Sequence, residues 1–312
     1  MIIMALLGAG LIAVGLPGLA RRPGGRVGPA CWARSALAVQ LTGLVVFEAA
    51  LALWAAPALL DLAGATDLAT VCRRMIGTGP GGAVGGVAAA MLALILAAAG
   101  GAGWWSVVRT QRRLRIEHCV GGHYTRNGCE LVVLPSPIPA AYTVGGRPPQ
   151  VVLTQGLVDR VGAAGLEAVW AHESVHANRA HHRYLAGTAA TNAAFRWYPP
   201  ASRAGRLIRL ALERWADEDA AATLSGGRAT ILETLLTVTT RSPTPQVAAF
   251  GAAETIAARI HALAAPPPDQ PPIWRILGYV LAGTLVLALL APTLWTGGMS
   301  ILALTNPGLC LV

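Results

Sequence analysis

The sequence predicts an α-helical membrane protein with about four transmembrane helices, together with one mainly-α domain that contains a small β-sheet. Composition supports the membrane part of this prediction. Of 312 residues, 54% are hydrophobic and only 12% are charged, which is typical of polytopic membrane proteins and not of soluble enzymes. The apolar stretches leave one long interval, residues 109–272, which is enough chain for one compact domain.

Four apolar stretches are long enough to cross a bilayer, which takes about 20 residues of helix. A signal peptide is the alternative interpretation of the first stretch. No basic residues precede its apolar run, however, so we expect an uncleaved helix. The chain then divides into residues 1–108 with three spans, the domain at 109–272, and residues 273–312 with the fourth span and a short tail. The four predicted spans are Met1–Ala20, Ser35–Leu60, Gly82–Val108 and Ile276–Thr296.

The arginines predict how these spans are oriented. All 24 basic residues are arginines; four of them lie in residues 21–34 without an acid, and four more lie in residues 109–115. The 61–80 loop is neutral, because two arginines there balance two aspartates. The positive-inside rule therefore predicts a multi-pass protein of the cell membrane, with an outer amino terminus and a cytosolic 109–272 domain. The net charge of +9 then reflects membrane orientation, so we expect contact with the lipid bilayer and no direct nucleic-acid binding.

A short motif in residues 165–179 predicts a metal site. The segment has helical periodicity and contains the pentad His-Glu-Ser-Val-His, residues 172–176. Positions four apart lie on one face of a helix, so His172 and His176 can bind one ion. Glu173 then projects toward the open coordination position, where a general base acts. This zincin signature predicts Zn²⁺, although a surface helix with two solvated histidines is the alternative.

A second amphipathic segment, residues 205–222, provides carboxylates for the same site. Glu213 can supply the third zinc ligand and leave the fourth position for water. Asp217, one turn later, can accept the outer N–H of a ligating histidine and fix its tautomer. For Glu213 alone, the alternative is an exposed acid on a helix surface.

Strand-like segments precede the histidine helix at residues 130–134, 141–144 and 150–154, separated by turns rich in proline and glycine. A strand edge beside a zinc helix can bind an extended peptide through its backbone. Further helices are expected at about 226–241 and 251–264.

Three runs of the domain resemble the gluzincin membrane peptidases: residues 150–157, residues 165–173 and the segment Glu213-Arg-Trp-Ala-Asp217. Within this group the chain is most similar to the BlaR/MecR-type antirepressor peptidases, and more distantly to the HtpX and CAAX-prenyl peptidases. The resemblance covers residues 120–260. It implies an integral-membrane zinc metalloendopeptidase with His172, His176 and Glu213 as zinc ligands, Glu173 as the catalytic base and Asp217 hydrogen-bonded to a ligand.

The oxyanion-stabilising group is less well defined. Arg259 resembles a late arginine of the family, and His181, His182 and Tyr184 are the other candidates. We expect His181 and His182 to be solvated residues beyond the site. The chain departs from the family where it has His181 in place of an Asp five residues after the second histidine. The β-lactam-sensing members carry a large extracellular penicillin-binding domain, which we do not expect for this chain from its sequence, so direct β-lactam sensing is not expected either.

The resemblance implies that the partner is a protein or peptide substrate, namely a BlaI-like cytosolic transcriptional repressor. Two alternatives remain, an HtpX-like quality-control peptidase and a non-proteolytic membrane receptor or scaffold. The intact ligand set argues against the last of these. Cys72 and Cys310 both fall on the outer side of the predicted topology, where they could pair, and Glu48 is the only charge in the second span.

Overall fold

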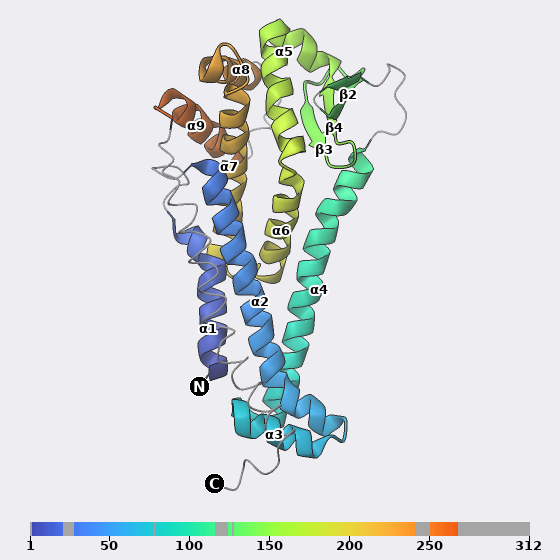
Figure 1. Ribbon diagram of the computed structural model, residues 1–312, viewed down its shortest axis with the longest axis vertical. Helices are drawn as coiled ribbons and strands as arrows, with labels where there is room; N and C mark the ends of the chain where they lie inside the picture. The colour runs from blue at the N-terminus through green and yellow to red at the C-terminus, as the bar shows by residue number, and fades with distance from the viewer. Residues whose placement is uncertain are drawn as a thin grey trace.

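The computed structural model describes residues 2–20, 28–77, 79–115, 124–126, 128–240 and 250–267. These residues form a mostly helical protein with one small sheet, which confirms the predicted fold class. The sheet lies beside α5 at the end of the molecule where α4 finishes, and α3 lies at the opposite end (Figure 1). The predicted fourth span, residues 276–296, and Cys310 lie outside the described residues.

Among the residues that the structure describes, three helices are long and apolar enough to cross a membrane. The first is α1 (Ile2–Gly15) with the short 3₁₀ helix η1 (Leu16–Leu19), the second is α2 (Pro29–Leu62) and the third is α4 (Gly82–Leu114). Helices α2 and α4 both extend beyond the predicted spans. Proline at the first position of α2 suits a helix start, and the arginines of residues 109–113 continue the helix of α4 past its apolar part.

Glycines allow α1 and α2 to approach closely. A Cβ atom at Gly10 would lie 2.9 Å from the backbone oxygen of Gly43, and one at Gly43 would lie 2.6 Å from the backbone nitrogen of Val14. Small residues at such crossings let helices pack through their backbones within a bilayer. A short amphipathic helix, α3 (Thr66–Ile76), then connects α2 to α4.

The sheet has four strands in the order β1-β2-β4-β3. They are β1 (Tyr124–Arg126), β2 (Cys129–Leu134), β3 (Ala141–Val144) and β4 (Gln150–Thr154). The three predicted strands are confirmed, and β1 adds a short antiparallel edge that the sequence analysis did not predict. Strand β2 pairs with β4 in parallel, whereas β3 pairs with β4 antiparallel, lies at the edge of the sheet and contacts α5.

In the described part of the chain, five helices follow the sheet. They are α5 (Gln155–Asn178), α6 (His181–Ala194), α7 (Pro199–Ala221), α8 (Gly227–Thr240) and α9 (Phe250–Ala264). The four predicted helices correspond to α5, α7, α8 and α9, and α6 is an addition. Helix α5 begins ten residues earlier than predicted, because its first turns are joined to the rest through a kink at Gly162, whose φ of 65° suits glycine.

Helix α6 and the start of α7 pack against the apolar helices (Figure 1). Phe195, between them, is fully buried with Phe47 of α2 and Leu96 of α4. Gln40 of α2 is also fully buried, and its Nε2 donates to the backbone oxygens of Val14 and Ala201, each 3.3 Å away. The predicted boundary at residue 108 stays a prediction, but α6 and α7 make extensive contact across it.

Candidate metal centre

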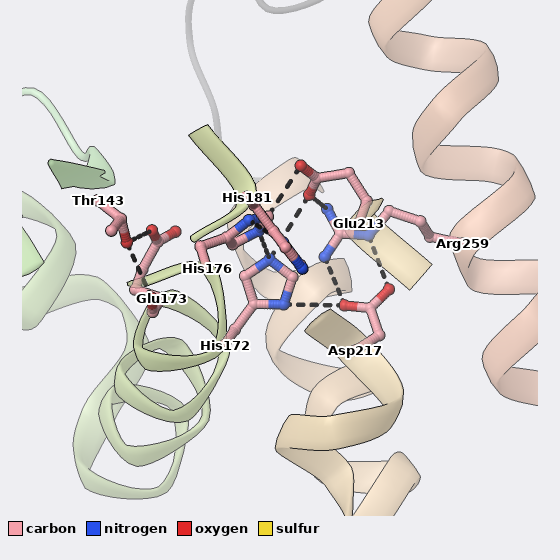
Figure 2. A network of polar contacts seen from close by, with 8 residues as sticks. All are labelled: Thr143, His172, Glu173, His176, His181, Glu213, Asp217 and Arg259. Atoms are coloured by element: carbon pink, nitrogen blue, oxygen red, sulfur yellow. Dashed lines mark hydrogen bonds and ion pairs between the residues drawn. The ribbon is translucent and has the colours of Figure 1, made fainter. Parts of the chain in front are cut away.

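Helices α5 and α7 bring together three side chains of types that can bind a metal ion (Figure 2). His172 and His176 lie one turn apart on α5, with their Nε2 atoms 3.2 Å from each other. Glu213 of α7 faces both: its Oε2 is 3.5 Å from Nε2 of His172, and its Oε1 is 3.7 Å from Nε2 of His176. The two segments that the sequence analysis paired are therefore adjacent in space.

This donor set fits a zinc ion. Ligand atoms about 2.0–2.1 Å from a tetrahedral zinc lie about 3.3 Å from one another, which is close to the three separations observed here. Two imidazoles and one carboxylate are also ligands that zinc prefers, and three protein ligands leave one coordination position for water. All three side chains are only partly exposed, so a bound ion would be held in a sheltered position.

Asp217 and Arg259 support His172 from the side of α7 and α9. Oδ1 of Asp217 lies 3.1 Å from Nδ1 of His172, where it can accept the outer N–H of that ring. The guanidinium of Arg259 donates to both oxygens of Asp217, at 2.9 and 2.7 Å, and its Nη1 lies 3.2 Å from Glu213. This bidentate pair fixes the carboxylate that orients His172.

His181 supports His176 in the same way, and the expectation that it is solvated is wrong. Its side chain is 1% exposed, and its Nδ1 lies 2.8 Å from Nδ1 of His176. The reason is the left-handed backbone of Ala180 (φ 52°), which ends α5 and turns the first residue of α6 back toward the site. His181 also packs on the indole ring of Trp215, with the ring centroids 4.8 Å apart. One feature of the sequence could have indicated this role for His181. The BlaR/MecR-type peptidases often have Asp at this position, and both Asp and His can accept a hydrogen bond.

Strand β3 positions Glu173. The hydroxyl of Thr143 lies 2.7 Å from Oε2 of Glu173 and 2.8 Å from its backbone oxygen, and with one hydrogen it donates to one of them at a time. Figure 2 shows Glu173 on the side of the histidines toward the strand, whereas Asp217 and Arg259 lie on the opposite side. Thr143 was not among the predicted site residues, because no motif marks a strand residue that meets the helix.

The electrostatic environment of His172, His176 and Glu213 favours a positive charge among these three side chains. Burial opposes charge on His172, but the carboxylates of Asp217 and Glu213 outweigh it and raise the pKa of His172 to about 9. Burial also opposes charge on Glu213, yet the neighbouring histidines and Arg259 hold the pKa of Glu213 well below its usual value. For His181, burial and the nearby His176 lower the pKa to about 3, so this ring is a neutral acceptor at physiological pH. A divalent cation is compatible with this electrostatic arrangement.

The remaining residues that were predicted as possible oxyanion donors, Tyr184, His182 and Arg259, differ in their surroundings. Tyr184 belongs to an aromatic cluster with His181 and Trp215. His182 is half-buried against the turn after β3. Arg259 is close to the ligands, but its guanidinium pairs with two carboxylates, so its oxyanion role stays a prediction.

Comparison with known proteins agrees with this geometry. A model of peptidase family M48 matches residues 115–210, which include the sheet, α5 with both histidines, and α6. The match covers less than a third of the chain and ends before Glu213. Comparisons with curated proteins and with solved structures found no match. The resemblance to the BlaR/MecR-type peptidases is untested and stays a prediction. The family match and the three apolar helices together indicate a membrane-associated metallopeptidase.

Proposed function

We propose that this protein is an integral-membrane zinc metallopeptidase that hydrolyses peptide bonds of a protein substrate. The observation that carries the proposal is the convergence of His172, His176 and Glu213, with separations that suit tetrahedral zinc. Glu173 follows the first of these histidines directly on the same helix. A bound zinc ion would act as a Lewis acid that lowers the pKa of water toward neutrality and polarises the scissile carbonyl.

The chain's own residues would supply the proton transfers. Glu173 would take the proton of the attacking water and return it to the leaving amine. Thr143 holds the Glu173 carboxylate toward β3 through a 2.7 Å contact, which limits its rotation. Strand β3 is the edge strand on this side, so an extended substrate could pair with its backbone and place a peptide bond beside Glu173.

The substrate we propose is a cytosolic transcriptional repressor of the BlaI type. Two features of the sequence support this part: the similarity to antirepressor peptidases, and the eight arginines of residues 21–34 and 109–115, which favour a cytosolic catalytic region. Alkaline phosphatase fused after Pro268 should therefore be inactive in cells, because this enzyme folds only outside the cytosol. An active fusion would place the site outside and exclude a transcription factor as the direct substrate.

The activity is tested with the full chain, purified in detergent and supplied with zinc. Two probes distinguish the candidate substrates: unfolded casein, and a purified repressor of the BlaI type. Cleavage of the repressor at one position by wild type, but not by Glu173→Gln, would support the antirepressor proposal. Cleavage of casein at many positions would instead favour a quality-control peptidase. If wild type and Glu173→Gln were equally inactive on both probes despite bound zinc, the proposed peptidase activity would be wrong.

A further inference from the structure

A cavity outside the metal centre lies where α4 leaves its apolar part. It has a volume of about 480 Å³ and is enclosed by the end of α4, the turn between β3 and β4, and the start of α6. These elements place it at the level where a membrane-spanning α4 would meet the bilayer surface on the catalytic side. The family match and the zinc chemistry do not account for it.

The rim of this cavity is strongly cationic. Four arginines line it and no aspartate or glutamate does, among the residues that the structure describes. The side chains of Arg147 and Arg183 are exposed and have no ion-pair partner in the described part of the chain. Arg115 is partly engaged, because it donates to the backbone oxygen of Pro148 at 3.2 Å and its Nη2 lies 4.0 Å from Oε2 of Glu130. Arg112 stacks over the ring of Trp105, with 5.2 Å from the guanidinium carbon to the ring centroid. Arginines so arranged can bind a phosphate.

The other wall of the cavity is apolar. It is formed by Trp104, Val107 and Val108 of α4 and by Ala186 of α6, and it continues the apolar surface of the α4 span. Tryptophan is common at the level of lipid headgroups. His182 also lines the cavity, and its Nδ1 is buried without a hydrogen-bond partner among the described residues. A free inorganic anion would use only the cationic rim, whereas a phospholipid would use the rim and the apolar wall.

We propose that this cavity binds the phosphate headgroup of an anionic phospholipid from the leaflet on the catalytic side. Arg147 and Arg183 would contact the phosphate, and the acyl chains would follow the apolar face of α4 into the bilayer. Basic pockets between helices at the membrane surface bind anionic lipids in this way. The proposal does not depend on peptidase activity or on which side of the membrane is cytosolic.

The cavity also adjoins the metal centre through β3. The backbone N–H of Gly145 donates to Oε1 of Gln111 on α4 at 2.7 Å. Gly145 comes two residues after Thr143, which contacts Glu173. A lipid bound between α4 and this turn would therefore hold the edge strand against α4.

The test is native mass spectrometry of the full-length protein in detergent. The probes are dioleoyl-phosphatidylglycerol and dioleoyl-phosphatidylcholine, which share acyl chains but differ in headgroup charge. The double variant Arg147→Gln/Arg183→Gln removes the two unpaired arginines of the cavity. The matched control, Arg206→Gln/Arg209→Gln, removes two exposed arginines of α7 that lie outside it, with the same change in net charge.

Wild type and the control should retain phosphatidylglycerol in preference to phosphatidylcholine. The cavity variant should retain it about 30-fold less, because each arginine near an anionic lipid contributes roughly a factor of five. Equal loss in the cavity variant and the control would show that only general surface charge attracts the lipid, and would overturn the proposal. Full displacement of the lipid by millimolar inorganic phosphate would also overturn it, because the site would then recognise a free anion. Zinc content and gel-filtration profile establish that each variant is folded.

Discussion

The two ends of helix α7 make different kinds of contact. Its second half carries Glu213 and Asp217 into a charged cluster with His172 and Arg259. Its first half is held by small and apolar residues, with Ala201 packed near Phe195 and α2. One helix therefore couples the metal centre to the apolar helices, and a change at one end should affect metal binding while a change at the other should affect stability.

The largest effect is expected at the charged end of α7, where Glu213→Ala should abolish metal binding. The substitution removes one of the three proposed zinc ligands and leaves Arg259 facing Asp217 alone. We expect the purified protein to lose stoichiometric zinc and all peptidase activity, measured by elemental analysis and by substrate cleavage. The control is Glu233→Ala, on an exposed position of α8. Full zinc occupancy in Glu213→Ala would remove this residue from the ligand set.

The next largest effects are expected from Asp217 and His181, the hydrogen-bond partners of the two histidines. We expect the loss of zinc affinity to be larger for Asp217 than for His181. Asp217→Asn takes the charged acceptor from His172, and outer partners of this kind typically contribute about 10–100-fold to metal affinity. His181→Ala takes a neutral acceptor from His176, so we expect a loss near the lower end of that range. Competition with a zinc chelator measures both affinities. His181→Asp should restore binding, and failure to do so would mean that His181 only fills space.

The smallest effect is expected at the apolar end, from Gln40→Leu. The amide of Gln40 links α1 and α7 through two hydrogen bonds of 3.3 Å in a buried position. Interhelical hydrogen bonds in membranes contribute on average about 0.6 kcal/mol each, so the free energy of unfolding should fall by about 1–2 kcal/mol. Zinc affinity should not change. Unfolding in mixed detergent measures this, with Val45→Ala at an exposed position of α2 as the control.

The elements with regular periodicity were predictable from the sequence. The first three apolar spans, the strands before the histidine helix, and the pairing of the 172–176 pentad with Glu213 all follow from local pattern and spacing. Helix α6, which is present in the structure but was not predicted, shows the limit of inference from local pattern. Its residues are mostly Ala, Gly and Thr, which give no amphipathic pattern because the helix is covered by α4 on one side and by α2 and α7 on others.

The supporting residues of the site were predictable only in part. Asp217 lies one turn after Glu213, so helix geometry placed it near His172. Helix geometry could not predict that the His181 side chain points toward His176. Its orientation depends on the left-handed backbone of Ala180, and alanine rarely adopts this conformation. Thr143 meets Glu173 only through the packing of β3 against α5, which no local pattern encodes.

The most direct test of the central claim is one paired measurement on Glu173→Gln, namely zinc content and peptidase rate of the same preparation. Glu173 is the proposed general base and is not among the three side chains that converge as candidate ligands. The variant should therefore keep one zinc per chain while its rate falls about 10²–10⁴-fold, the usual cost of removing a general acid–base group. A variant that cleaved substrate at the wild-type rate, or that lost its zinc, would contradict this assignment of base and ligands.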